Sequence, residues 1–174
     1  GLKIVDVSTP SEPSLEGERT TEKSVSFVAL SSTEDTAYLA LENGGGLEII
    51  DVSDFSSLVL RGAYSVQDDI SSIVLSSDDN TAFVAATSGG LHIVDVSDPD
   101  DPVQRGDSAY DIGNSISSVA ISSDGNKAYL AATTGGLHIV DIPDLDDPVF
   151  DGEYVLNEVV NWVVLSSNDG VAYL

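Results

Sequence analysis

Two histidines, His92 and His138, are the residues best suited to acid–base chemistry or metal binding near neutral pH. Both occupy one position of a repeated segment, where the other copies have Lys3 and Glu48. Equivalent positions of successive repeats lie too far apart to share a metal, so we expect a tolerant, partly exposed strand position. The sequence Gly-x-Ser-x-Gly, which would mark a serine nucleophile, is absent. We therefore predict no catalytic residue and no enzyme activity.

Closely spaced aspartates supply the oxygen ligands that calcium prefers. Two turns are rich in them, and the calcium candidates are Asp98, Asp100, Asp101, Asp144, Asp146 and Asp147. The spacing is not that of an EF-hand loop, and prolines at 99, 102, 143 and 148 indicate rigid turns. A solvated acidic turn is the alternative that we favour, with calcium as the other possibility and no further cofactor.

One aspartate ends an otherwise apolar segment in every repeat. A carboxylate in such a strand must accept hydrogen bonds, because burying it without partners is costly. We expect a structural role, in which the carboxylate accepts backbone N–H groups of the following turn. The four residues are Asp6, Asp51, Asp95 and Asp141.

The charge balance excludes several classes of partner. The 174 residues include 30 Asp and Glu against 6 Lys and Arg, which gives a net charge of −24. Nucleic acids and anionic membrane surfaces are disfavoured by that charge, and no apolar run is long enough for membrane insertion. A hydrophobic content of 41% is too high for a disordered acidic tail.

The elements that carry these residues come from an internal repeat. A Gly-Leu-x-Ile segment recurs with its leucines 45, 44 and 46 residues apart, followed in each copy by a glycine, a Ser-Ser pair and an Ala-aromatic pair. Each unit predicts four short strands, placed in the second unit near 47–52, 58–65, 70–75 and 81–86. Both faces of the first of these strands are apolar, which is typical of a sheet covered on two sides. We predict an all-β fold, a β-propeller of four-stranded repeats.

These residues resemble the LVIVD-repeat family. The signature appears as Leu2-Lys3-Ile4-Val5-Asp6, Leu47-Glu48-Ile49-Ile50-Asp51, Leu91-His92-Ile93-Val94-Asp95 and Leu137-His138-Ile139-Val140-Asp141. The resemblance implies β-propeller-like repeats of bacterial or archaeal cell-surface proteins, with no shared catalytic chemistry. The second position departs from the family pattern, because it holds Lys, Glu or His.

The repeat boundaries predict one repeat domain over 1–174. It consists of a half-blade at 1–22, repeats beginning near 24, 69 and 115, and a half-blade at 159–174. The two half-blades expose strand edges that must be paired. Three arrangements remain open: closure within the chain as a four-bladed ring, pairing with a neighbouring copy, and a fragment of a longer propeller.

Aromatic residues are the candidates for ligand or interface contacts. Phe27 and Trp162 occupy one inner-strand position that is serine in the other two units, and we expect them to become neighbours if the ring closes. Tyr110 lies in a loop two residues longer than its counterparts, and we expect it to be exposed there.

Together these features predict a non-enzymatic scaffold, secreted or at the cell surface, for protein–protein interaction, adhesion or self-assembly. Its partners would be surface proteins or its own copies. The alternatives are a carbohydrate- or peptide-binding propeller that takes a glycan at its aromatic residues, and a part of a larger enzyme. The acidic composition suits a salty medium, where charge repulsion is screened, and the absence of Cys and Met suits an oxidising one.

Overall fold

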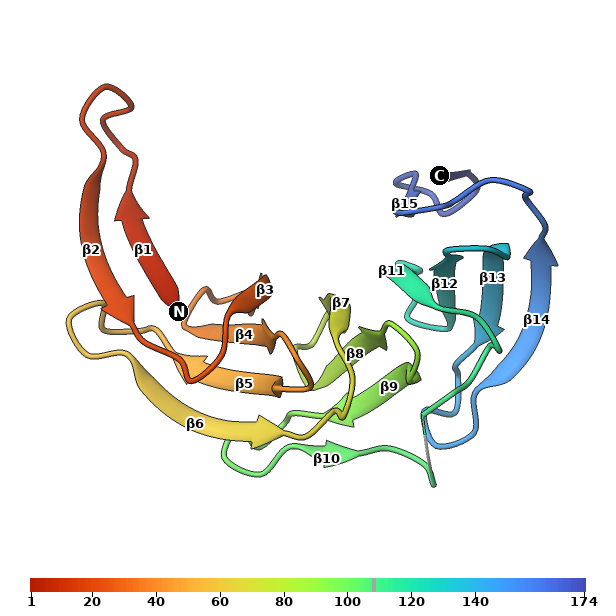
Figure 1. Cartoon of the computed structure of the whole chain (residues 1–174), viewed down its shortest axis with the longest axis horizontal. Helices are drawn as coiled ribbons and strands as arrows, with labels where there is room; N and C mark the ends of the chain where they lie inside the picture. Colours follow the sequence, from red (N-terminus) through yellow and green to blue (C-terminus); the bar gives the residue numbers. More distant parts are fainter. Residues whose placement is uncertain (108) are drawn as a thin grey trace.

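A computed structural model describes residues 1–107 and 109–174, which form an arc of short antiparallel sheets (Figure 1). Every element in this part of the chain is a strand, as the all-β prediction requires. The strands coincide with runs of Val, Ile, Leu and aromatic residues, and the turns with Ser, Asp and Gly. Among the described residues there is no helix with the length and hydropathy needed to cross a membrane.

Three sheets have four strands each, and we number them blades 1 to 3. Blade 1 consists of β3 (Val25–Leu30), β4 (Thr36–Leu41), β5 (Gly46–Asp51) and β6 (Val59–Tyr64). Blade 2 consists of β7 (Ile70–Leu75), β8 (Thr81–Ala86), β9 (Gly90–Asp95) and β10 (Val103–Gln104). Blade 3 consists of β11 (Ile116–Ile121), β12 (Lys127–Ala132), β13 (Gly136–Asp141) and β14 (Val149–Tyr154). The predicted strands of the second unit agree with β5 to β8 within one residue at each end.

Two hairpins flank these blades. The N-terminal hairpin pairs β1 (Leu2–Asp6) with β2 (Ser14–Arg19), and the C-terminal hairpin pairs β15 (Val164–Leu165) with β16 (Ala172–Tyr173). They remain separate two-stranded sheets at opposite ends of the arc (Figure 1). Of the three arrangements that the sequence leaves open, closure within the chain as a four-bladed ring is not the one that this structure adopts. The blades stack through their inner strands, β3 against β7 and β7 against β11. The rotation from one blade to the next adds up to only part of a circle (Figure 1).

The core lies between successive blades. Leu47 and Ile49 of β5 pack with Ile73 and Val84 of blade 2, and each of these side chains is buried. A second cluster joins blades 2 and 3 in the same way. Because each of the three blades is covered on both faces, its third strand is apolar on both sides, as the sequence pattern indicated.

The recurring glycine of each fourth strand permits this close stacking. A Cβ atom at Gly17, Gly62 or Gly106 would collide with a backbone carbonyl oxygen in the turn of the following blade. At Gly152 an added Cβ would meet nothing within 4 Å. The repeated glycine thus marks the contact between one blade's outer strand and the next blade's turn.

Candidate functional site

The recurring aspartates sit at the ends of β1, β5 and β9, where each supports the turn that follows. Asp51 Oδ1 accepts the backbone N–H of Ser53 at 3.0 Å and its Oγ–H at 2.6 Å, and Asp95 makes the same pair with Ser97. Asp6 accepts the N–H of Ser8 at 2.8 Å. Hydrogen bonds from these serines lower the pKa of all three carboxyl groups. The strand ends leave these carboxylates exposed or half-buried, so solvent shares in stabilising them.

Asp141 differs because Pro143 stands where the other units have serine. Proline has no N–H to donate, and the carboxylate instead accepts the Lys127 ammonium at 2.5 Å. The same ammonium lies 2.7 Å from Asp151, and its hydrogen bonds to both carboxylates raise the pKa of Lys127. The fourth copy therefore keeps the aspartate but changes its partner.

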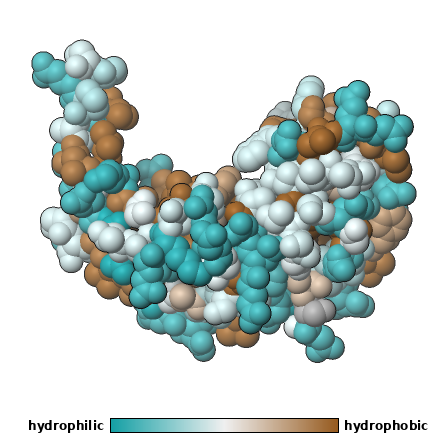
Figure 2. Space-filling model, in the orientation of Figure 1, coloured by the Kyte–Doolittle hydropathy of each residue, from teal (hydrophilic) through white to brown (hydrophobic). Residues whose placement is uncertain are grey.

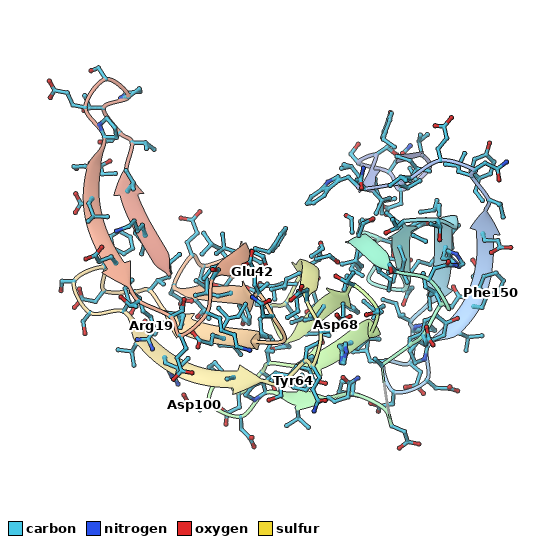
Figure 3. All side chains as sticks on the ribbon, viewed as in Figure 1. Arg19, Glu42, Tyr64, Asp68, Asp100 and Phe150 are labelled. Atoms are coloured by element: carbon cyan, nitrogen blue, oxygen red, sulfur yellow. The ribbon has the colours of Figure 1, made fainter. Side chains whose placement is uncertain are left out.

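The acidic turns dock on the preceding blade. Arg61 of β6 binds both carboxylate oxygens of Asp100, at 2.6 and 2.7 Å, on the convex side of the arc (Figure 3). Arg105, which follows β10, binds both oxygens of Asp146 at 2.7 and 3.1 Å. Each arginine directly precedes the glycine over which the turn packs, so the ion pair and the close backbone contact reinforce each other.

This docking changes the interpretation of the calcium candidates. Asp98 and Asp144 accept the backbone N–H of Asp100 and Asp146, each at 3.0 Å. Across residues 1–107 and 109–174, no three acidic or histidine side chains converge as metal ligands. The structure does not bring the six aspartates together as a calcium site, because two of them serve as partners of arginine.

The histidines lie in different surroundings. His92 Nδ1 is 3.0 Å from the hydroxyl of Tyr64, which donates to Gln104 at 2.6 Å. Burial lowers the pKa of His92. His138 is only 7% exposed, so the expected partial exposure is wrong for this residue. The two histidines serve as packing residues of separate blades.

The aromatic pair meets without ring closure. The rings of Phe27 and Trp162 lie 6.4 Å apart between centroids, at an interplanar angle of 32°. Phe27 belongs to β3 and Trp162 precedes β15, and both elements line the concave side of the arc (Figure 1). The expectation that these residues become neighbours only on closure is therefore wrong, since the inner strands converge on one side.

Tyr110 is half-buried, not exposed as expected. Its backbone exchanges two hydrogen bonds with Leu91, at 2.8 and 2.9 Å, and its ring packs against the core between blades 2 and 3. The longer loop thus returns to the ladder of β9 beyond β10. Tyr110 completes the blade and is no candidate for a free contact surface.

The two hairpins leave apolar side chains exposed at positions that the complete blades bury. Val5 of β1 is 45% exposed, whereas Ile50 and Val94, its equivalents in blades 1 and 2, are fully buried. Tyr173 of β16 is 63% exposed, whereas its equivalent Phe83 is 2% exposed. Figure 2 shows the apolar side chains along the N-terminal hairpin. Each hairpin therefore displays side chains that a complete blade would cover.

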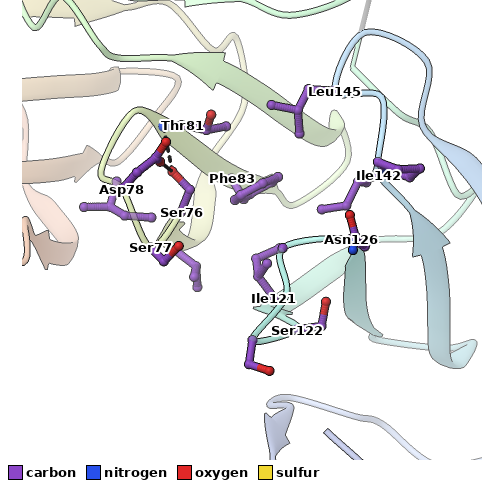
Figure 4. Close-up of a pocket in the computed structure, with 15 residues that line it drawn as sticks. Ser76, Ser77, Asp78, Thr81, Phe83, Ile121, Ser122, Asn126, Ile142 and Leu145 are labelled. Atoms are coloured by element: carbon purple, nitrogen blue, oxygen red, sulfur yellow. Dashed lines mark hydrogen bonds between the residues drawn. The ribbon is translucent and has the colours of Figure 1, made fainter.

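A cleft of about 480 Å³ opens between blades 2 and 3 (Figure 4). Phe83, Ile142 and Leu145 form its apolar wall, and Ser77 and Asn126 lie among its polar residues. The sequence analysis did not single out this cleft. The available signal was Gly125, which replaces the acidic residue found at the same place in the other three units.

Stacked four-stranded antiparallel sheets with inner strands against one another define a β-propeller type of repeat protein. The family model of the LVIVD repeat matches residues 1–21, 28–66, 70–107 and 113–155. The chain belongs to the LVIVD repeat family, and the resemblance inferred from its sequence is confirmed.

Solved structures share the fold at low identity. The β-propeller domain of Cps50 (Swd1) from Myceliophteria thermophila matches with a TM-score of 0.68 and 13% identity, over 90% of this chain and 54% of that one. The periplasmic gluconolactonase PpgL of Pseudomonas aeruginosa gives a TM-score of 0.65 and 16% identity, over 83% and 48%. A functionally unknown protein from Desulfotomaculum acetoxidans gives 0.56 and 10%, over 91% and 65%.

This chain spans between 48% and 65% of the length of those three structures. Identities this low show the fold alone. The comparison with curated proteins gives no match.

Proposed function

We propose that the chain is a non-enzymatic propeller scaffold that mediates protein–protein association through its two hairpins. The observation that carries this proposal is the contrast in exposure between equivalent residues. Side chains such as Val5 and Tyr173 are exposed on the hairpins, whereas blades 1 and 2 bury Ile50 and Phe83 at the same positions. The strands β1 and β16 are each paired on one side only, and unpaired edges of strands with exposed apolar side chains favour association with further strands.

The partner that fits these edges is a second copy of the chain. In blade 3, β12 pairs with β13 so that Ala128 lies opposite Val140. The repeat places Ala172 and Val5 at the same two positions, so β16 of one copy and β1 of another have the register of a complete blade. Such a contact is head-to-tail and would extend into a larger ring or a filament.

The net charge of −24 opposes this association at low salt. Ions screen charge repulsion beyond about 8 Å at physiological ionic strength, and a saline exterior would favour assembly. This argument, with the absence of Cys and Met, supports a secreted or cell-surface location.

The non-enzymatic part of the proposal is supported by the occupation of the polar groups. The recurring aspartates accept hydrogen bonds from turn serines, and Asp100 and Asp146 are bound to arginines. These carboxylates hold turns and blades together, so their lowered pKa values have a structural cause.

Multi-angle light scattering across a concentration series, at low and high NaCl, tests the assembly. We expect a mass above one chain at high salt, returning to one chain in Val5→Glu. Val103→Glu is the matched control, because Val103 is 53% exposed on the outer strand of blade 2, away from both hairpins. A single-chain mass throughout, or equal disruption by both variants, would overturn the proposal.

A carbohydrate or peptide is the second candidate partner, favoured by one observation. Trp162 is 50% exposed beside Phe27, and such aromatic surfaces stack on sugar rings and peptide side chains. A glycan array read with the wild type and Trp162→Ala tests it. Glycan binding that disappears in the variant supports this candidate, and the absence of any binding removes the carbohydrate version.

A further inference from the structure

Serine–carboxylate clamps join neighbouring blades at one edge of the arc. The backbone N–H of Ser32 donates to Asp79 Oδ2 at 2.8 Å, and its Oγ–H donates to the same atom at 2.5 Å. Ser123 binds Asp169 Oδ2 with the same two distances. Each serine is the second residue of a Ser-Ser pair, and each aspartate comes from the turn of the next sheet.

The clamp is missing between blades 2 and 3. Ser77 is the second serine of the pair in blade 2, and Gly125 stands where the other turns have Asp79 and Asp169. The backbone conformations agree, with φ of +72° at Gly125 against +59° and +55° at the aspartates. A Cβ atom at Gly125 would meet nothing within 4 Å. Within residues 1–107 and 109–174, neither donor of Ser77 has a protein partner.

The cleft lies where the carboxylate is missing. Ser77 and Gly125 both line it, and the half-buried Ile121 and Leu145 form an apolar wall beside them (Figure 4). Its volume of about 480 Å³ falls in the range of small-molecule sites. Two donors that bind a carboxylate elsewhere in this molecule thus border a cleft of ligand size that has an apolar wall.

We propose that this cleft binds a small monocarboxylate with an apolar body. The carboxylate accepts the N–H and Oγ–H of Ser77, in the place that Asp79 and Asp169 take at the other clamps. The apolar body lies against Ile121 and Leu145, which line the cleft and are half-buried, and its burial adds to the affinity.

We expect the cleft to prefer a ligand with a single negative charge. Asp78 lines the cleft, and its hydrogen bonds with Ser76 and Asn80 keep its pKa low, so a second carboxylate would be repelled. A single carboxylate is compatible with a neighbouring aspartate, because Asp169 binds Ser123 directly beside Asp124. Hydrogen bonds from Ser122 and Asn126 lower the pKa of Asp124 to about 2, so that neighbour is charged as well.

Phenylacetate is a suitable probe, and neutral phenylacetamide is its match in shape. Titrations followed by amide chemical shifts are expected to move Ser77 and Gly125 with phenylacetate. Phenylacetamide is expected to bind about tenfold more weakly, since hydrogen bonds to a charged acceptor are the stronger ones. Absence of shifts with phenylacetate, or equal affinity for both probes, would overturn the proposal.

Two variants, each with a matched control, locate the site. Gly125→Asp is expected to build the clamp within the chain and abolish phenylacetate binding, whereas Gly125→Ala retains it. Ser77→Ala is expected to weaken binding about tenfold, and Ser32→Ala, at an existing clamp, leaves it unchanged. Unchanged binding in Ser77→Ala contradicts the proposal, even if Gly125→Asp does not fold.

Discussion

On the inner strand of each blade, a serine hydroxyl lies between a carbonyl oxygen of its own blade and one of the following repeat. Replacing these serines by alanine tests how much the bridges stabilise the stacking, because the bridge distances differ between blades. Ser117 Oγ lies 3.0 Å from the carbonyl oxygen of Ala131 in its own blade and 2.6 Å from that of Val160, in the segment that precedes β15. Ser71 makes the same bridge at 3.0 and 2.8 Å. Both distances are 3.4 Å for Ser26, at the limit of a hydrogen bond.

These distances set the expected magnitudes. Val160 is buried, so Ser117→Ala leaves its carbonyl oxygen sheltered without the hydroxyl donor. A lost hydrogen bond of this kind costs about 1–2 kcal/mol, which lowers the unfolding midpoint by roughly 2–8 °C in a chain of this size. Ser71→Ala should cost about the same. For Ser26→Ala we expect less than about 0.5 kcal/mol, because its geometry is poor.

Urea unfolding followed by circular dichroism measures the three free energies. Hydrogen exchange at β15 and β16 shows whether the loss at Ser117 is local, as expected where each repeat contacts only its neighbours. Equal losses in Ser26→Ala and Ser117→Ala would refute the link between bridge geometry and stability. No loss in any of the three variants would refute the bridge itself.

Three further perturbations follow from the described contacts. Burial lowers the pKa of His92, so its contribution to stability is complete above the unfolded pKa of about 6.5 and falls at lower pH. Urea midpoints between pH 8 and 5 should fall less in His92→Gln, and equal slopes would contradict this. Gly136→Ala combines a φ of +87° with a clash against a carbonyl oxygen of β14, so its unfolding free energy should drop by more than about 1 kcal/mol. Gly125→Ala is the control, because Gly125 has a similar φ but an added Cβ would meet no neighbour there. If both variants lose the same unfolding free energy, the clash at residue 136 does not contribute to the loss. Arg105→Met should lower the melting temperature at low salt, with a smaller difference at high NaCl, because the pair with Asp146 is partly exposed. A salt-independent difference would indicate lost packing.

Local features of the fold were predictable from the sequence. The strands near 70–75 and 81–86 match β7 and β8, because alternating apolar residues and Ser-Asp-Asn turns act over a few residues. Whether the blades form an open arc or a closed ring could not be predicted in the same way. The rotation from blade to blade depends on how inner strands pack, and small differences accumulate over successive sheets.

The candidate site was predictable only in part. The recurring aspartates Asp51 and Asp95 accept the turn N–H groups that their position indicated. The ion pairs of Arg61 and Arg105 were missed, although each Arg-Gly dipeptide recurs in register and carried the signal. Tyr110 was misjudged because a local pattern does not reveal that the chain rejoins the β9 ladder after an insertion.

Departures from the repeat are the most informative positions of this chain. Stacked blades share one backbone arrangement, so a substitution at one copy changes one contact while its equivalents remain as internal controls. Gly125 removes a carboxylate that Asp79 and Asp169 supply, and the cleft lies at that interface. Pro143 removes an N–H that Ser97 supplies, and Lys127 takes over the aspartate. The first departure leaves two donors of Ser77 at the border of a cleft, whereas the second is compensated within the chain, so Gly125 is the departure that offers a contact to a ligand.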